Sequence, residues 1–324
     1  MKRATGWRAV RQSGSAEANA PERCLRGPER RRRDDIPDTQ ARRSVTKNNR
    51  GYTVPDQSVD RLLEHYTIER RLADRLRAAP PGQRSRVYGE VYDELFRCIP
   101  DHPQLSIDPA QRNQQVLARL RFVSRFLDKD SCLMEIGAGD CAFSINAAHL
   151  IRLGIVVDVS EVIVSVAAGL EKLEIVITDG VSLPVERGSV DVAYSDQLME
   201  HLHPDDAKAQ LANVVRALRP GGVYICITPN RIYGPHDVSR GFDEVATGLH
   251  LREYSAHEIR EMFLAAGFKK VDFYAGGRGH YVRLPTSAAL AAETTFERLP
   301  RLIRDKVPRL ALCLIFGLNV VATR

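Results

Sequence analysis

The pattern of apolar and polar positions changes character near residue 130. Before that point, apolar residues recur every three or four positions over residues 59–76, as on one face of an amphipathic helix. The run Pro80-Pro81-Gly82 ends this helix. A second short helix is predicted over residues 86–97. A third is predicted from residue 108 to about residue 127, because Asp108 suits an N-cap and Pro109 suits the first helical position.

After residue 130, short β-rich runs alternate with helical patterns, which is typical of a parallel sheet. The predicted strands are residues 132–136, 155–158, 175–178, 190–194, 223–228 and 271–274, with a seventh over 317–323. The predicted helices are residues 143–151, 161–170, 205–218 and 256–266. The sequence therefore predicts the α/β fold class, with a doubly wound, mostly parallel sheet of seven strands.

The N-terminal segment, residues 1–55, differs from the rest in composition. It is rich in Arg, Pro, Gly, Ser and Asn and too poor in apolar residues to offset its ordering entropy, so we predict a disordered basic arm. Residues 1–50 carry 14 Lys or Arg and 6 Asp or Glu, whereas residues 51–324 carry 33 and 35. Because the body lacks a basic excess, no nucleic-acid partner is expected. The arm is either a solvated tail, which we favour, or a tether to an anionic surface.

The chain is thus predicted to comprise the arm, a helical flank or lid over residues 56–128, and an α/β domain over residues 129–324. Within that domain, residues 285–312 are interpreted as a helical insertion. This arginine- and leucine-rich region suits a membrane surface as well, but we favour helices packed on the domain. The longest apolar stretch, residues 310–321, is too short to span a bilayer. Because the N-terminus shows no secretory signal and the six cysteines form no Cys-x-x-Cys pair, we expect a cytoplasmic protein with free thiols.

The strongest chemical signal is the run over residues 133–142, in which a buried strand enters a glycine-rich turn and then a helix. Gly137 permits a sharp turn, and Gly139 leaves space for a ligand beside the backbone. The spacing also matches the dinucleotide-binding fingerprint, and a tight strand-to-helix turn without a ligand is a further alternative. Asp158 ends the second predicted strand, where a carboxylate can accept hydrogen bonds from both hydroxyls of a ribose. Together these features indicate nucleoside binding.

Three downstream runs help to distinguish between nucleoside cofactors. Thr178-Asp179-Gly180 follows the third strand, Ser195-Asp196-Gln197 follows the fourth, and Leu218-Arg219-Pro220-Gly221-Gly222 precedes the fifth. In this order, and over about residues 133–274, the set resembles the class I S-adenosylmethionine-dependent methyltransferases of the small-molecule type. The resemblance implies a Rossmann-like methyltransferase fold and S-adenosylmethionine as the cofactor. Cys141 stands where the family often has a third glycine.

The resemblance also implies a role for each matching residue. It places Glu135, Gly137 and Gly139 near the methionine part of the cofactor. It places Asp158 at the ribose, with Val159 beside it, and Asp179 and Gly180 at the adenine. Ser195 and Gln197 are placed near the transferred methyl group. The acidic Glu135 suits an ammonium group and would be unfavourable beside a pyrophosphate. A nicotinamide-dependent oxidoreductase and a non-catalytic adenosyl-binding regulator remain as alternatives.

The long loop over residues 229–254 is interpreted as the acceptor-binding segment. It is dense in His, Asp, Arg and Tyr, and it follows a strand at the edge of the sheet where ligands bind. We expect a small-molecule acceptor methylated on a hydroxyl oxygen, with nitrogen and carbon as alternatives. A hydroxyl acceptor favours a histidine as general base, and the candidates are His201, His236 and His250. No metal site is predicted, because no metal-binding signature matches the spacing of His201, His203, Asp205, Asp206, His236 and His250.

Overall fold

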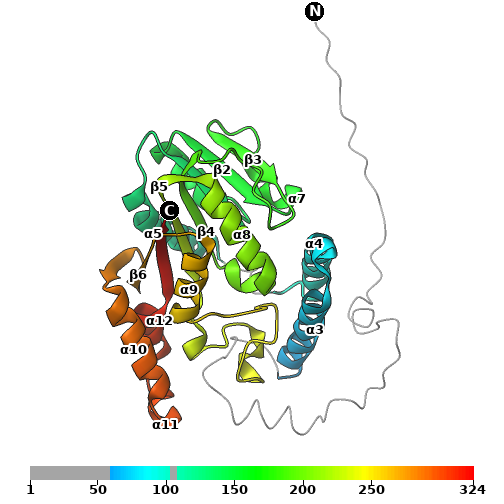
Figure 1. Cartoon of the computed structure of the whole chain (residues 1–324). Helices are drawn as coiled ribbons and strands as arrows, with labels where there is room; N and C mark the ends of the chain where they lie inside the picture. Colours follow the sequence, from blue (N-terminus) through cyan, green and yellow to red (C-terminus); the bar gives the residue numbers. More distant parts are fainter. Residues whose placement is uncertain (1–58, 103–107) are drawn as a thin grey trace, which may run out of the picture.

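The computed structural model describes residues 59–102 and 108–324, so the predicted disordered arm lies outside the described residues. Within this part, eight strands form one sheet in the order β3-β2-β1-β4-β5-β8-β6-β7 (Figure 1). The five strands from β3 to β5 are parallel, and β8 is antiparallel to both of its neighbours. The strands are β1 (Cys132–Ile136), β2 (Leu153–Asp158), β3 (Leu173–Ile177), β4 (Val190–Asp196), β5 (Leu218–Thr228), β6 (Lys270–Gly277), β7 (His280–Leu284) and β8 (Leu318–Thr323).

Helices cover both faces of the sheet, because successive strand residues point to opposite faces and both sets are apolar. On one face, Met134 and Cys226 belong to a buried cluster with side chains of α3, α4, α8 and α9. On the other face, Leu133 and Ile225 belong to a buried cluster with side chains of α5 and α6. The helices are α3 (Val59–Ala78), α4 (Pro81–Cys98), α5 (Pro109–Val123), α6 (Ala142–Ala147), α7 (Glu161–Val164), α8 (Pro204–Ala217), α9 (Ala256–Ala266), α10 (Thr286–Arg298), α11 (Arg301–Arg304) and α12 (Arg309–Phe316).

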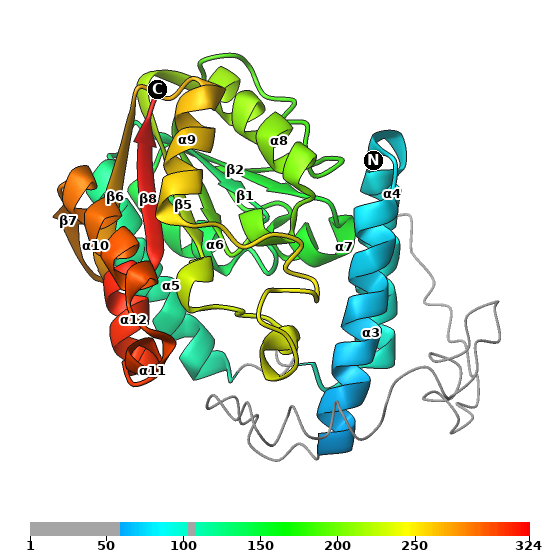
Figure 2. The same ribbon diagram turned by 60° about the horizontal axis from the view of Figure 1, so that its bottom comes forward.

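The helices α3 and α4 run side by side along one flank of the molecule (Figures 1 and 2). Leu72 of α3 and Leu95 of α4 are buried in the cluster that also contains Met134 of the sheet, so this hairpin shares the core of the α/β domain. Pro81 is the first residue of α4, five residues before the predicted start, because the fixed φ of proline suits the first helical turn. Asp108 caps α5 as predicted, accepting a 2.9 Å hydrogen bond from the Gln111 amide.

Among the described residues the sheet has eight strands, one more than the seven predicted. The additional strand, β7, pairs only with β6 and forms the edge of the sheet. Its sequence signal is weak because only Tyr281 of its five residues is buried. An edge strand with one buried position lacks the alternation that reveals a half-buried strand.

The predicted helical insertion forms α10, α11 and α12, which pack on the domain through one face. Phe296 of α10 and Leu312 of α12 are buried together with Ile232 of the long loop. Leu302 and Leu310, in contrast, are 80% and 59% exposed. No helix among the described residues is both long and apolar enough to cross a membrane.

The predicted free thiols are observed at four of the five cysteines in the described residues, namely Cys132, Cys141, Cys226 and Cys313.

Candidate active site

A cavity of about 1640 Å³ opens at the carboxyl ends of β1, β2, β4 and β5. Its two parts differ in origin. The strand half is lined by residues that follow the parallel strands, among them Glu135, Gly139, Asp158, Gly180 and Gln197. The helix half is lined by side chains of α4, α5 and α12 and of the long loop, among them Tyr92, Arg119, His236 and Leu314. The volume exceeds the roughly 300–1,000 Å³ of a typical single-ligand pocket, so two ligands can be held together.

The glycine-rich turn forms the floor of the strand half. Gly137 and Gly139 have positive φ angles of 71° and 52°, which glycine adopts without strain. A Cβ at Gly137 would lie 2.9 Å from a methyl carbon of Leu198, whereas a Cβ at Gly139 would meet nothing within 4 Å. The backbone at Gly139 therefore borders open space in the cavity, and a side chain there would project into it.

Asp158 ends β2 and lines the strand half. Its Oδ1 accepts hydrogen bonds from the amides of Val159 (2.7 Å) and Ser160 (3.0 Å), and its Oδ2 accepts one from Gly139 (3.0 Å). Because two carboxylate oxygens provide about four acceptor positions, the side chain is fixed in place and still has capacity to bind a ligand hydroxyl.

Glu135 lies beneath the turn and is 6% exposed. Its Oε2 accepts a 3.1 Å hydrogen bond from the amide of Ser144 and another from the Ser144 hydroxyl. Burial raises the pKa of Glu135 to about 8, and the nearby charges of Asp140 and Asp196 add to this shift. A bound cation would relieve this cost and restore the ionised carboxylate.

Residues 134–226, which include the glycine-rich turn and the ends of the first four strands, match a family model described as a methyltransferase domain. This domain belongs to the class I S-adenosylmethionine-dependent methyltransferases. Its cofactor is S-adenosylmethionine. The mostly parallel sheet with helices on both faces confirms the predicted Rossmann-like fold.

Two similar curated proteins carry the same description. A probable S-adenosylmethionine-dependent methyltransferase of Mycolicibacterium smegmatis is 34% identical over 141 residues, 43% of this chain and 52% of that protein. Another, of Mycobacterium tuberculosis, is 31% identical over 189 residues, 58% of this chain and 64% of that protein. The chain thus spans about half to just under two thirds of the length of these relatives.

A solved structure of an S-adenosylmethionine-dependent methyltransferase from Archaeoglobus fulgidus covers 65% of this chain and 94% of its own, with 16% identity and a TM-score of 0.44.

The strand half of the methyltransferase domain fits this cofactor. The buried carboxylate of Glu135 suits its ammonium group, Asp158 offers acceptor positions to a ribose, and Gly139 leaves the turn open beside the cavity. Val159, Gly180 and Gln197 also line the cavity.

Two residues predicted to bind the cofactor have their side chains engaged elsewhere. Asp179 folds back on its own turn, where its carboxylate accepts hydrogen bonds from the amides of Val181 (2.9 Å) and Ser182 (2.6 Å). Ser195 is 1% exposed, and its hydroxyl lies 2.7 Å from the hydroxyl of Tyr224 on the α8 face of the sheet. Neither residue lines the cavity.

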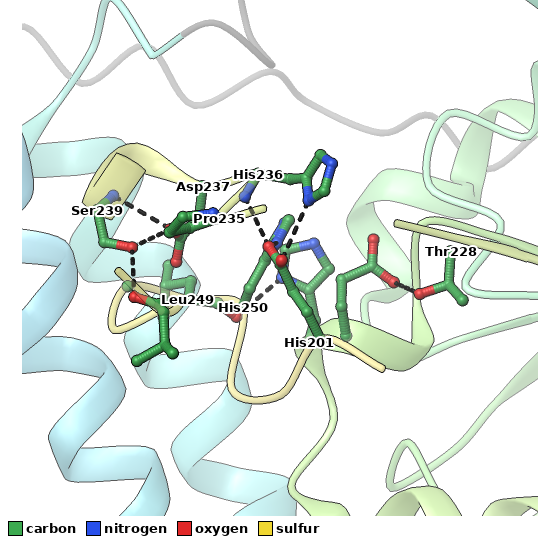
Figure 3. A network of polar contacts seen from close by, with 12 residues as sticks. His201, Thr228, Pro235, His236, Asp237, Ser239, Leu249 and His250 are labelled. Atoms are coloured by element: carbon green, nitrogen blue, oxygen red, sulfur yellow. Dashed lines mark hydrogen bonds and ion pairs between the residues drawn. The ribbon is translucent and has the colours of Figure 1, made fainter. Parts of the chain in front are cut away.

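The three candidate histidines come together at one end of the cavity, although they are up to 49 positions apart in the sequence (Figure 3). His236 and His250 each place Nδ1 on the carboxylate of Glu253, at 3.0 and 2.7 Å. The ring of His201 meets that of His250 edge to face, with centroids 4.8 Å apart. Only His201 and His236 line the large cavity, whereas all three line a smaller cavity of about 140 Å³ next to it.

The hydrogen bonds define the tautomers of these rings. A carboxylate only accepts, so Nδ1 of His236 and of His250 carries the proton. Nδ1 of His201 donates to the carbonyl oxygen of Leu249 at 3.0 Å, with the hydroxyl of Tyr92 at 3.1 Å. Nε2 of His236 is buried and without a partner in the described residues. In the neutral ring, Nε2 of His236 carries a basic lone pair, and the residue lines both cavities.

Burial and neighbouring charges shift the pKa values of this group in opposite directions. Burial, reinforced by the charge of His250, lowers the pKa of His201 to about 3. Burial alone would lower the pKa of His250, but the hydrogen bond to Glu253 and the charge of Glu200 raise it to about 9. For Glu253, the hydrogen bonds from His236 and His250 outweigh burial and lower the pKa to about 2. Neutral and charged histidines therefore lie side by side in one small space.

Sequence reasoning missed a polar group that also lines the cavity. Arg119 of α5 holds the carboxylate of Asp196 with two hydrogen bonds of 2.9 and 3.2 Å and donates a third, of 2.8 Å, to the hydroxyl of Tyr281. Burial of Arg119 opposes its charge, but the neighbouring Asp196 raises its pKa. Strand alternation could have indicated that Asp196 faces the cavity, since its neighbour Ser195 points to the opposite face.

Proposed function

We propose that this protein transfers the methyl group of S-adenosylmethionine to a hydroxyl oxygen of a small-molecule acceptor, with His236 as general base. The observation that carries the proposal is the buried, unpartnered Nε2 of His236 at the cavity, with Nδ1 of the same ring held by Glu253. The cavity volume of about 1640 Å³ supports simultaneous binding of a cofactor and an acceptor.

The name of one similar protein supports transfer to oxygen. A malonyl-[acyl-carrier protein] O-methyltransferase of Hahella chejuensis is 31% identical over 96 residues, which cover 29% of this chain and 33% of that protein. Its name specifies an oxygen acceptor.

In the strand half, we assign cofactor binding to the residues that line the cavity. Glu135 binds the ammonium group, and Asp158 accepts hydrogen bonds from the ribose hydroxyls. The turn at Gly137 and Gly139 provides the contact surface for the methionine part. When bound, S-adenosylmethionine supplies a methyl group activated by a sulfonium centre.

In the helix half, the protein positions the acceptor and receives its proton. Nε2 of His236 accepts the proton of the attacking hydroxyl, and Glu253 stabilises the imidazolium that results. Because Glu253 also binds the backbone amide of His236 at 2.7 Å, the ring is held in one orientation. The neighbouring walls of α4 and α12, which include Tyr92 and Leu314, exclude water from the reacting atoms.

The test is methyl transfer from radiolabelled S-adenosylmethionine to a panel of small hydroxylated acceptors. His236→Gln should lower kcat by about 100-fold or more, as expected for loss of a general base, and leave cofactor affinity unchanged. The residual rate of this variant should rise about tenfold per pH unit, because hydroxide then replaces the missing base. His149→Gln, at an exposed histidine that does not line the cavity, is the matched control and should behave as wild type.

Three results would contradict the proposal. Full activity of His236→Gln would show that His236 is not the general base. Binding of NADH without binding of S-adenosylmethionine would indicate an oxidoreductase. Cofactor binding with no turnover on any acceptor class would indicate an adenosyl-binding regulator.

A further inference from the structure

Beside the proposed base, three side chains with metal-binding atoms converge on one point. Glu200, His201 and His250 each offer one ligand atom, and the three atoms lie within 4.8 Å of one another. Glu200 and His201 follow β4, whereas His250 belongs to the distant end of the long loop. Glu200 is fully buried, and His250 is 8% exposed.

Both histidines are oriented as metal-ligating histidines are. Such residues donate one ring N–H to a carbonyl or carboxylate, which fixes the ring and leaves the other nitrogen for the metal. Here Nδ1 of His201 donates to the Leu249 carbonyl, and Nδ1 of His250 donates to Glu253. This leaves Nε2 of each ring as the nitrogen that can bind a cation (Figure 3), and His250 must release its Nε2 proton when the ion binds.

Glu200 provides an independent indication. Its Oε2 accepts a 2.8 Å hydrogen bond from the hydroxyl of Thr228, which orients the carboxylate. Its Oε1 is buried and has no hydrogen-bond partner among the described residues. An unpaired carboxylate oxygen in a buried position is unfavourable, and a bound cation would satisfy it.

A second cluster, formed by His65, Glu69 and His102, has a similar composition but lacks this feature. Oε1 of Glu69 lies 2.7 Å from Nε2 of His65 and 3.5 Å from Nε2 of His102. Its Oε2 accepts a hydrogen bond from the amide of Leu249 at 3.2 Å. Both carboxylate oxygens are satisfied by the protein, and the ring nitrogens face the carboxylate. This cluster therefore has an internal structural role.

We propose that Glu200, His201 and His250 bind a divalent first-row transition-metal ion. Two imidazoles and one carboxylate favour ions from Mn²⁺ to Zn²⁺, whereas Mg²⁺ and Ca²⁺ prefer sites made of oxygen atoms. Metal–ligand distances of about 2.0–2.2 Å require the three atoms to draw together by roughly 1 Å when the ion binds.

The location gives the ion a place in the reaction, and this part rests on the proposed function. His201 lines both cavities, together with Tyr92 and His236. An ion on His201 would leave coordination positions open toward the helix half of the cavity, where the acceptor hydroxyl is proposed to bind. The hydroxyl would then be acidified by the ion as well as deprotonated by His236.

The experiment measures metal binding by the full chain in the absence of any acceptor, so that it does not depend on methyl transfer. The protein is freed of affinity tag, stripped with a chelator and titrated with Co²⁺, monitored by visible absorption, and with Zn²⁺ and Mg²⁺ by calorimetry. We expect one Co²⁺ or Zn²⁺ per chain and much weaker binding of Mg²⁺. Glu200→Gln and His250→Gln should each weaken Co²⁺ binding by about 100-fold or more. His102→Gln changes the other cluster, so it should weaken Co²⁺ binding far less than His250→Gln does.

Binding of S-adenosylmethionine, measured on the same samples, shows that each variant is folded. Absence of stoichiometric Co²⁺ or Zn²⁺ binding by the wild type would overturn the proposal, whether or not any variant folds. Loss of binding in His102→Gln with retention in His250→Gln would also overturn it, because the ion would then belong to the other cluster. Metal binding without methyl transfer to any acceptor would leave the metal site intact and contradict only the proposed function.

Discussion

The two halves of the cavity are built in different ways. The strand half is formed by short turns that follow consecutive parallel strands, and its groups are fixed by nearby backbone amides, as the carboxylate of Asp158 is by Gly139 and Val159. The helix half is formed by segments far apart in the chain, namely α4, α5, α12 and the long loop. Figure 2 shows the long loop between the α3–α4 hairpin and α12. There, side chains make the connections: the hydroxyl of Tyr66 in α3 donates to Asp243, at 2.7 Å and 177 positions away.

This difference indicates which half depends on global packing. The cluster around Glu69 connects α3, the segment after α4 and the loop, through His65, His102 and the amide of Leu249. Gly248 makes this approach possible, because a Cβ there would lie 2.6 Å from the Glu69 carboxylate. Damage to such a connection should loosen the helix half, whereas damage to the strand half should weaken cofactor binding alone.

The largest effect is expected for Glu69→Ala, which should separate the helix half from the rest. The change leaves two buried histidines and a backbone amide without this acceptor, and each buried donor left unsatisfied costs about 1–3 kcal/mol. We expect thermal unfolding roughly 10 °C lower. Glu64→Ala on the same helix is the matched control: its partner Arg61 is partly exposed, so the cost should stay below about 1 kcal/mol.

The pH dependence of stability tests the same cluster. For Glu69, burial acts to raise the pKa, but the hydrogen bonds from His102 and His65 prevail and lower it from 4.5 to about 2. A lowered folded-state pKa gives stability that is complete above pH 4.5 and is lost as the pH falls toward about 2. The stability difference between wild type and Glu69→Ala should therefore shrink over that range in acid denaturation. A difference that is constant down to pH 2 would show that the pKa of Glu69 is the same in the folded and the unfolded protein.

The next largest effect is expected for Asp158→Ala, which alters the strand half of the cavity. Hydrogen bonds to a charged group contribute about 1.5–3 kcal/mol each, so loss of the contacts to two ribose hydroxyls should weaken S-adenosylmethionine binding by about 100-fold or more. Calorimetric titration measures this. Asp179→Ala is the comparison variant, since its carboxylate caps its own turn, and it should weaken binding by less than about tenfold. Equal losses in both variants would contradict the assignment of Asp158 as the principal ribose ligand.

The same difference explains what the sequence could predict. The glycine-rich turn, Asp158 and the first five strands follow from local patterns, since a strand that enters a turn and a helix is encoded within about ten residues. The pairing of His236 and His250 on Glu253 required folding of the long loop, for which no local pattern exists. The histidines could be named as residues of a suitable type, but their common carboxylate could not.

The sheet face to which a strand side chain points is a second source of error. The run Ser195-Asp196-Gln197 was predicted to lie near the transferred methyl, but neighbouring residues of a strand point to opposite faces. β4 continues to Asp196, so Ser195 turns toward Tyr224 and Asp196 toward Arg119. A motif match gives the position of such a residue along the chain. The sheet face to which its side chain points depends on where the strand ends.

The smallest effect is expected for Ser195→Ala, which tests this point about register. The Ser195 hydroxyl bonds to the buried Tyr224 hydroxyl and does not line the cavity, so its removal should cost about 1 kcal/mol of stability. Affinity for S-adenosylmethionine should change by less than about twofold, because no ligand contact is lost. Gln197→Ala is the matched comparison two residues away, where the side chain lines the cavity, and it should weaken binding several-fold without loss of stability. Calorimetric titration and thermal unfolding separate the two effects. If Ser195→Ala weakened cofactor binding tenfold while stability was unchanged, the Ser195 side chain would have to reach the cofactor, and the distinction between the two faces of β4 would be wrong.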